Sequence, residues 1–212
     1  MSIFKEDTRC ARLRRLGTYR RAAVSKLETS ALDALVEIRN SAQERTRRIA
    51  EEEGDDSWNV FFESFAVDEA NEAITLLHEL LVLAAHKAIE QHLVRLAKLA
   101  FDVSNERELY KFSKLKALFR KNSIQLEGAI HFHCINELRL VANSVKHGGV
   151  VSKELAALPR WKLNQKLWDL QPFYKRVIPL VPLFIEHSVI LVEEACGCYV
   201  APSSELKEAL NA

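Results

Sequence analysis

The chain has 212 residues, enough for one sizeable hydrophobic core, and carries only 6 Gly and 5 Pro. Because Leu, Ala, Glu, Lys and Arg are abundant and turn residues are scarce, the composition excludes a many-stranded sheet and predicts an all-α helical bundle of about five to seven helices. The 30 Lys and Arg almost balance the 29 Asp and Glu, so any nucleic-acid contact must be a local patch.

The first half of the chain predicts two long helices. Apolar residues recur at helical spacing from Asp7 to Glu53, with Gly17 as a candidate bend and Gly54 as a candidate C-terminal cap. After a short apolar segment, Asp68 is the candidate N-cap of a second helix that runs to Leu99. This second helix is apolar nearly all round, so we expect it at the centre of the bundle.

The next two predicted helices are polar on one side. Ser104 opens a basic helix that continues through Phe119. A fourth helix runs from about Leu126 to His147 and ends at Gly148–Gly149, where glycine can take the left-handed conformation that closes a helix.

The C-terminal part predicts a short turn and one last long helix. Ser152 caps the turn, and the helix runs from about Phe173 or Pro179 to Tyr199. Its apolar stretch Val177–Val192 contains prolines and charged residues, so we expect a buried helix that does not cross a membrane. No segment has the composition of a flexible linker, and we expect a single domain over residues 1–212.

The cysteines and the N-terminus predict a cytoplasmic protein. No pair among Cys10, Cys134, Cys196 and Cys198 has the two-residue spacing that zinc sites favour, and we expect neither a disulfide nor a metal framework. No cofactor is predicted either. The segment Met1–Arg15 lacks the apolar core of a signal peptide.

The fourth predicted helix carries the segment that points to chemistry. One of its faces is apolar, and a second face presents Asn136, Arg139, Asn143 and Lys146 at spacings of three and four. His147 lies roughly 40° round from Asn143 and borders this polar face. Such a set suits RNA cleavage without a metal, because histidine can transfer the ribose proton while arginine or lysine holds the phosphate.

The string from Glu137 to Gly149 resembles the motif helix of the HEPN superfamily (higher eukaryotes and prokaryotes nucleotide-binding). It also resembles the Asn-x-x-Lys-His-Gly ending of a group of uncharacterised bacterial helical proteins. The segment His86–Glu90 is similar to part of the helix that packs on the motif helix in such proteins, and the resemblance covers roughly Glu69 to Leu158.

This resemblance implies a HEPN-like core at about 67–200 with the long helix 7–53 packed on it. It also implies RNA binding or metal-independent ribonuclease activity, in phage defence or a toxin–antitoxin setting, with an antitoxin as a protein partner. A homodimer would bring two motif helices face to face.

The superfamily's catalytic arginine has no counterpart here, because its place holds Ala142. The nearest arginine, Arg139, lies one turn earlier and is long enough to reach a phosphate near His147. The candidate roles are therefore acid/base for His147, phosphate charge for Arg139, and orientation for Asn143 and Lys146. His86 and Glu90 are supporting candidates on the neighbouring helix.

Each of these residues also has a structural interpretation. His147 and Lys146 suit a helix C-terminus, and Arg139 and Asn143 fit a solvated face or a buried hydrogen bond to Glu90. His131 and His133 point about 200° apart on a helix and cannot chelate one ion. Two basic runs favour either RNA contact or a solvated face: Arg9, Arg12, Arg14, Arg15, Arg20 and Arg21, and Lys111, Lys114, Lys116, Arg120 and Lys121.

The alternative function is a non-catalytic interaction or regulatory bundle. In that case the apolar segments Trp58–Phe65 and Trp161–Phe173 bind a protein partner. An open cleft containing Arg139, Asn143 and His147 favours the RNA hypothesis, and burial of all three against Glu90 favours the alternative.

Overall fold

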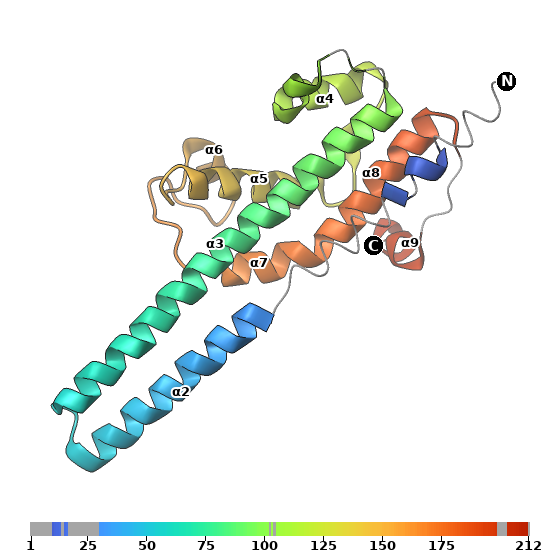
Figure 1. Ribbon diagram of the computed structural model, residues 1–212. Coiled ribbons are helices and arrows are strands. Elements are labelled where there is room, and N and C mark those ends of the chain that lie inside the picture. The colour runs from blue at the N-terminus through green and yellow to red at the C-terminus, as the bar shows by residue number, and fades with distance from the viewer. Residues whose placement is uncertain are drawn as a thin grey trace.

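The computed structural model describes residues 10–13, 15–16, 30–101, 103, 105–198 and 203–211. In these ranges the regular elements are α-helices and short 3₁₀-helices, and strand-type pairing is limited to one isolated bridge between Val150 and Lys166. The prediction of an all-α helical bundle is confirmed. Figure 1 shows a two-helix arm that extends from a body formed by the remaining helices.

The arm is an antiparallel hairpin of α2 (Ser30–Glu53) and the N-terminal half of α3 (Trp58–Ala100). Gly54 closes α2 as predicted, with φ of +89° and its amide donating to the Ala50 carbonyl at 2.9 Å. The predicted cap Asp68 is wrong, because the Ser57 side chain accepts the Val60 amide at 3.2 Å and starts α3 before the aromatic segment. At 1.5 Å per residue, the 43 residues of α3 span about 65 Å.

The predicted helix Asp7–Glu53 is described in two parts. Residues 10–13 and 15–16 are helical and α2 covers the end of the predicted range, while the candidate bend at Gly17 lies outside the described residues. Leu13 and Leu16 are buried in the core of the body.

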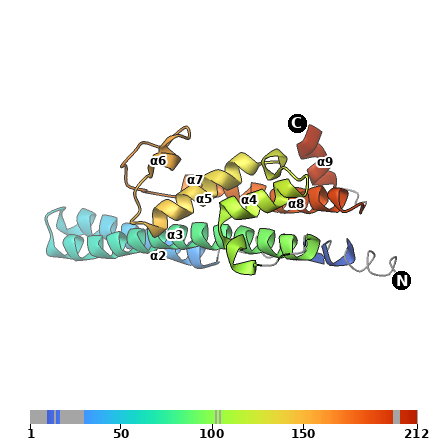
Figure 2. The same ribbon diagram turned by 90° about the horizontal axis from the view of Figure 1, so that it is seen from above.

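The C-terminal half of α3 lies at the centre of the body, as predicted. Its Val82, Ile89, Leu93 and Leu96 are all buried, and it contacts α4, α5, α7 and α8. Figure 2 shows α5, α7 and α8 in a second layer over this part of α3. The arm half of α3 has α2 on one side and lies beyond this second layer (Figures 1 and 2).

The third and fourth predicted helices are each divided. The third consists of the 3₁₀-helix η1 (Glu106–Tyr110) and α4 (Phe112–Lys121), and Asn105 caps η1 by accepting the Arg107 amide at 3.2 Å. The predicted cap Ser104 lies outside the described residues. The fourth consists of η2 (Leu126–Gly128) and α5 (Phe132–Lys146), because His131 has φ of +59° and interrupts the helix.

The C-terminal part is also more segmented than predicted. Ser152 caps α6 (Lys153–Ala156) as expected, and its side chain accepts the Leu155 amide at 3.2 Å. The predicted last helix is α7 (Gln171–Val177), the 3₁₀-helix η3 (Ile178–Leu180) and α8 (Val181–Ala195), because its prolines lack the amide that a continuous helix needs. The sequence analysis missed α9 (Ser204–Asn211).

Cys10 and Cys198 form a disulfide, with their Cα atoms 6.1 Å apart, which overturns the expectation of no disulfide. Spacing rules test neighbouring cysteines, whereas these two are separated by 188 residues and meet only through the fold. Cys134 is buried and Cys196 is partly buried, and neither is in a disulfide. Among the described helices, none combines the length and the hydropathy that crossing a membrane requires.

We expect the air-oxidised protein to expose two titratable thiols in denaturant, and four after reduction. Reduction is expected to lower the free energy of unfolding by about 5 kcal/mol at most, because the bond closes a loop of 188 residues in the unfolded chain. Thiol titration and denaturant unfolding with and without reductant measure both effects. Cys196→Ser is the control variant, because Cys196 is not in the disulfide. Four free thiols in the unreduced wild-type protein would contradict the pairing of Cys10 with Cys198.

Candidate active site on helix α5

Packing and a glycine-rich end position the motif helix α5. Ile135, Leu138 and Ala142 are buried on its apolar side. At its C-terminus, Gly148 and Gly149 have φ of +98° and +68°, and the Gly149 amide donates to the Ser144 carbonyl at 2.9 Å. These contacts fix the helix and leave its polar side facing α3, α4 and solvent.

Arg139 is partly buried against α4. Its Nε and Nη2 donate to the Asn136 Oδ1 at 3.2 and 3.0 Å, and its guanidinium lies 5.0 Å from the centre of the Phe112 ring. Burial lowers the pKa of Arg139, and the carboxylate of Glu154 acts in the opposite direction. Arginine stays protonated in this setting, so the group is a fixed cation at the α4–α5 contact.

A groove of about 560 Å³ runs between α4 and α5. It is lined by Phe112, Ser113, Lys116, Ala117, Arg120, Asn136, Arg139 and Glu154. The side chains of Lys116 and Arg120 each pair with Glu127, at 2.7 and 3.0 Å, and the hydrogen bond from Lys116 is the main reason that the pKa of Glu127 is lowered. The groove therefore joins the basic face of α4 to the polar face of α5, two features that the sequence analysis treated separately.

His86 and Glu90 reach α5 from α3. Together with Tyr110, Phe112 and Arg139 they line a small enclosed cavity of about 30 Å³, room for one or two water molecules at most. Burial lowers the pKa of His86 to about 4, and the nearby charge of Lys146 adds to this. Its Nδ1 is buried and has no hydrogen-bond partner among the described residues. With the lowered pKa, the imidazole is neutral at pH 7.

The predicted site residues do not all converge. Arg139 lies with His86 and Glu90, and Lys146 is near enough to act on the charge of His86, but Lys146 and His147 are exposed at the helix end. Eight residues of helix separate the Cα atoms of Arg139 and His147 by about 12 Å along the axis and turn them about 80° apart. The open cleft containing Arg139, Asn143 and His147 is not formed within one chain.

The alternative prediction that Arg139 forms a buried hydrogen bond to Glu90 is wrong. Arg139 donates to Asn136, while the Glu90 carboxylate pairs with Lys87. Asn143 is partly buried, and its backbone carbonyl accepts the His147 amide at 3.1 Å. His147 is thus the C-cap residue of α5 through its backbone amide, whereas the predicted interpretation gave the imidazole that role.

Glu137 is the important polar residue that the sequence analysis missed. It is only 8% exposed, and its Oε1 accepts hydrogen bonds from Trp161 Nε1 at 2.8 Å and Arg176 Nη2 at 2.7 Å. These bonds attach the segment after α6 and the helix α7 to α5. A signal was present, because Glu137 is the one charged residue among the apolar positions Cys134, Leu138 and Val141.

The two predicted apolar surfaces differ in exposure. Trp58, Phe61, Phe62 and Phe65 are all exposed, as the interaction hypothesis requires. In the other segment, Phe173 is buried and Trp161 packs against the core, so Trp161–Phe173 is not one open surface.

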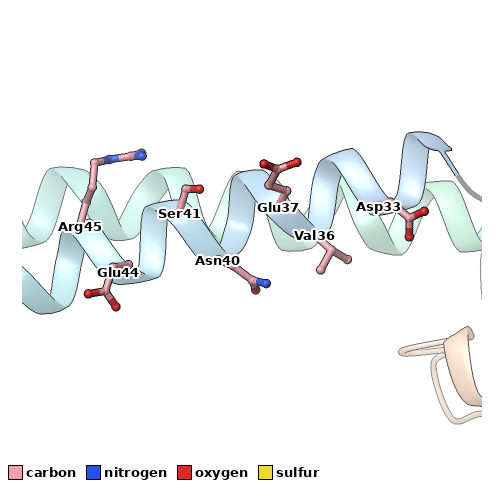
Figure 3. Close-up of a pocket in the computed structure, with 7 residues that line it drawn as sticks. All are labelled: Asp33, Val36, Glu37, Asn40, Ser41, Glu44 and Arg45. Atoms are coloured by element: carbon pink, nitrogen blue, oxygen red, sulfur yellow. The ribbon is translucent and has the colours of Figure 1, made fainter.

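The remaining candidates do not form a site. His131 has a left-handed backbone, and in the ranges that the structure describes no three His, Cys, Asp or Glu residues are grouped to hold a metal ion. Of the N-terminal basic run, Arg12 and Arg15 are exposed and the other four arginines lie outside the described residues. An open trough of about 600 Å³ along α2 is lined by residues spread over several turns of one helix, which do not point to a common centre (Figure 3).

Comparison with known proteins assigns no family. No family pattern matches the chain, and no solved structure matches it. A segment of 87 residues is 29% identical to phosphomethylpyrimidine synthase of Methanocorpusculum labreanum, covering 41% of this chain and 19% of that protein. The chain thus spans about a fifth of that relative's length, and the match carries no activity over to it.

Glu137→Ala is expected to lower the free energy of unfolding by about 3 kcal/mol, because Trp161 and Arg176 lose their shared acceptor. Denaturant unfolding measures the change. Glu154→Ala, in the open groove, is the matched control and should change stability by about 0.5 kcal/mol or less. Equal effects of the two substitutions would contradict the anchoring role of Glu137.

The neutral state of His86 predicts how stability depends on pH. The pKa of His86 is about 4 in the folded protein, against an ordinary histidine pKa of 6.5. As the pH falls below 6.5, the unfolded chain therefore takes up this proton before the folded protein does. Stability should therefore fall between about pH 6.5 and pH 4, by roughly 3 kcal/mol at most. NMR titration of the His86 ring measures the pKa, and His86→Asn should remove this part of the pH dependence. A ring that titrates near pH 6.5 would contradict the burial effect.

Proposed function

We propose that the protein binds RNA in the α4–α5 groove and acts as a HEPN-like, metal-independent ribonuclease in a bacterial defence or toxin–antitoxin setting. The observation that carries the proposal is that Lys116, Arg120 and Arg139 line one groove. Three cations from two helices suit successive phosphates, and Phe112 adds an aromatic ring to the same wall.

A carboxylate that pairs with two of the groove's cations defines how binding occurs. Glu127 holds Lys116 and Arg120 in the free protein, so an incoming phosphate competes with this carboxylate for the two cations. Binding of this kind exchanges one ion pair for another and weakens steeply as salt rises. The charged groove therefore sets the affinity for RNA, and a preference for particular bases would come from contacts outside the groove.

Cleavage requires Arg139 and His147 to act on one phosphate, and two chains meet this requirement better than one. An antiparallel pair of α5 helices with its two-fold axis at Asn143 places Arg139 of each copy opposite His147 of the other. The exposed His147 then transfers the proton, and Arg139 holds the developing charge. Asn143 lies on the axis, where its amide orients both groups.

An RNA substrate favours the cytoplasm, whereas the Cys10–Cys198 disulfide favours an oxidising compartment. An antitoxin is the expected protein partner of such an enzyme. A non-catalytic interaction module is the second candidate function. The exposed aromatic residues of the arm favour it, since soluble monomers rarely leave such a cluster uncovered.

The proposal predicts separable effects on binding and cleavage of a labelled single-stranded RNA in chelator. Arg139→Ala should weaken binding about tenfold, because one phosphate contact is lost, and reduce the salt dependence. His147→Ala should leave binding intact and lower the cleavage rate on the order of a hundredfold or more, with the melting temperature unchanged. Asn143→Ala should follow His147→Ala. Lys207→Ala, on the exposed face of α9, is the matched control.

Mixing the two inactive variants tests the shared site. Heterodimers of Arg139→Ala and His147→Ala chains contain one intact pair, so an equal mixture should recover about a quarter of the wild-type rate. Sedimentation velocity checks that the variants remain dimers. Cleavage that survives Arg139→Ala, Asn143→Ala and His147→Ala would place the activity elsewhere, and RNA binding without cleavage would leave a binding protein.

A further inference from the structure

The arm half of α3 has a second apolar face that none of the described residues covers. Trp58, Phe61, Phe62, Phe65, Leu76 and Leu80 are between 48% and 74% exposed. At 100° per residue, these six positions fall within a sector of about 100°, opposite the side of α3 that contains the buried residues Ala70, His78 and Val82. We name these six residues the outer stripe.

The outer stripe has the area of an interface. Aromatic side chains bury about 150–250 Å² each, so the exposed fractions of Trp58, Phe61, Phe62 and Phe65 leave on the order of 500 Å² of ring surface uncovered. Leu76 and Leu80 bring the stripe close to the roughly 800 Å² that each partner contributes to a standard protein interface. A lone apolar residue on a surface needs no explanation, but a stripe of this size does.

The surroundings of the outer stripe are acidic. Between Ile49 and His86 the sequence has ten Asp and Glu and no Lys or Arg, and Arg47 and Arg45 of α2 pair with two of these, Glu51 and Glu63. The exposed carboxylates of Asp68, Glu69 and Glu72 lie along the stripe. An anionic membrane or an RNA is repelled by such a surface, and a cationic partner is attracted to it.

The tip of the arm contains a hollow that fits a basic side chain. It has a volume of about 460 Å³ and is lined by Asp55, Asp56, Ser57, Trp58, Val60, Phe61 and Ser64. The Trp58 and Phe61 rings meet edge to face with their centres 5.7 Å apart. Two carboxylates beside two aromatic rings hold a lysine or arginine by charge and by cation–π attraction together.

We propose that the outer stripe binds a basic amphipathic α-helix of a partner protein. From Trp58 to Leu80 the stripe extends for about 33 Å, which matches a partner helix of about six turns. The apolar seam of that helix covers the stripe, its flanking Lys and Arg face Glu69 and Glu72, and one basic side chain enters the tip hollow. This surface is separate from the α4–α5 groove and goes beyond the proposed RNA function.

A second copy of the chain fits the same surface poorly. Antiparallel pairing of two outer stripes sets the aromatic end of one against Leu76 and Leu80 of the other, but its axis passes through Glu69. The two Glu69 carboxylates then face each other at the axis, with Glu72 of each copy about one helical turn away, and like charges at an interface are unfavourable. The charge pattern therefore favours a basic partner over self-association.

The test uses a fluorescein-labelled amphipathic helical peptide of Leu and Lys, about 20 residues long, titrated with the full-length protein. The control peptide has the same pattern with Glu in place of Lys. We expect the Leu/Lys peptide to bind at least tenfold more tightly than the Leu/Glu peptide. Equal binding of the two peptides would overturn the proposal.

Matched variants locate the binding. The double substitution Trp58→Ser and Phe62→Ser removes exposed rings and should weaken the Leu/Lys peptide at least tenfold, while Glu69→Gln with Glu72→Gln should weaken it several-fold. Trp168→Ser is the control, because Trp168 is 68% exposed but lies on the body. Circular dichroism verifies that each variant is folded, and full binding by the Trp58 and Phe62 variant would contradict the outer stripe as the site.

Sedimentation velocity of the protein without peptide distinguishes a dimer formed through the outer stripe from one formed through α5. A dimer that dissociates when Trp58 and Phe62 are changed assigns the outer stripe to a second copy and overturns the basic-helix proposal. A dimer that is unchanged by those substitutions leaves the outer stripe free and supports it. Loss of RNA binding in the same variant would assign the stripe to RNA and would also overturn the proposal.

Discussion

The uninterrupted hydrogen bonding of α3 from Trp58 to Ala100 is the constraint on which the other features depend. One rigid helix supplies the centre of the body at its C-terminal end and half of the arm at its N-terminal end. It presents His86 and Glu90 to α5 about two-thirds of the way along its length and carries the outer stripe on its first half. A break in α3 would separate the core, the α5 contact and the arm, so the backbone of this single helix sets the geometry of all three.

The sequence correctly predicted the helix ends and caps that depend on a few neighbouring residues. Gly54 and Gly148 adopt positive φ where the sequence placed helix ends, and Ser152 caps the turn that it was expected to cap. The prediction was wrong where two local signals competed, since Ser57 takes the cap assigned to Asp68 because the aromatic segment between them continues the helix. The disulfide between Cys10 and Cys198 has no local signal, because only the complete fold brings the two cysteines together.

The sequence predicted which residues share a face of α5, but not how those residues contact the neighbouring helices. Helical spacing correctly separates the polar face of α5, on which Asn143 is partly buried and Lys146 exposed, from its buried face. The stacking of Arg139 on Phe112 depends on how α4 docks, and no pattern in one sequence fixes that docking. Burial by several elements also lowers the pKa of His86, so its neutral state follows from the fold and not from the residue type.

The balanced net charge conceals two surfaces of opposite sign. The body presents Lys116, Arg120 and Arg139 in one groove, whereas the segment of the arm between Ile49 and His86 has ten Asp and Glu, of which Glu51 and Glu63 pair with arginines of α2. Because exposed charges act over only about 10 Å at moderate salt, each surface selects its own partner whatever the sum over the chain. The acidic arm repels a polyanion that approaches along α3. In the functions proposed above, this repulsion confines RNA to the body and leaves the arm for a cationic partner.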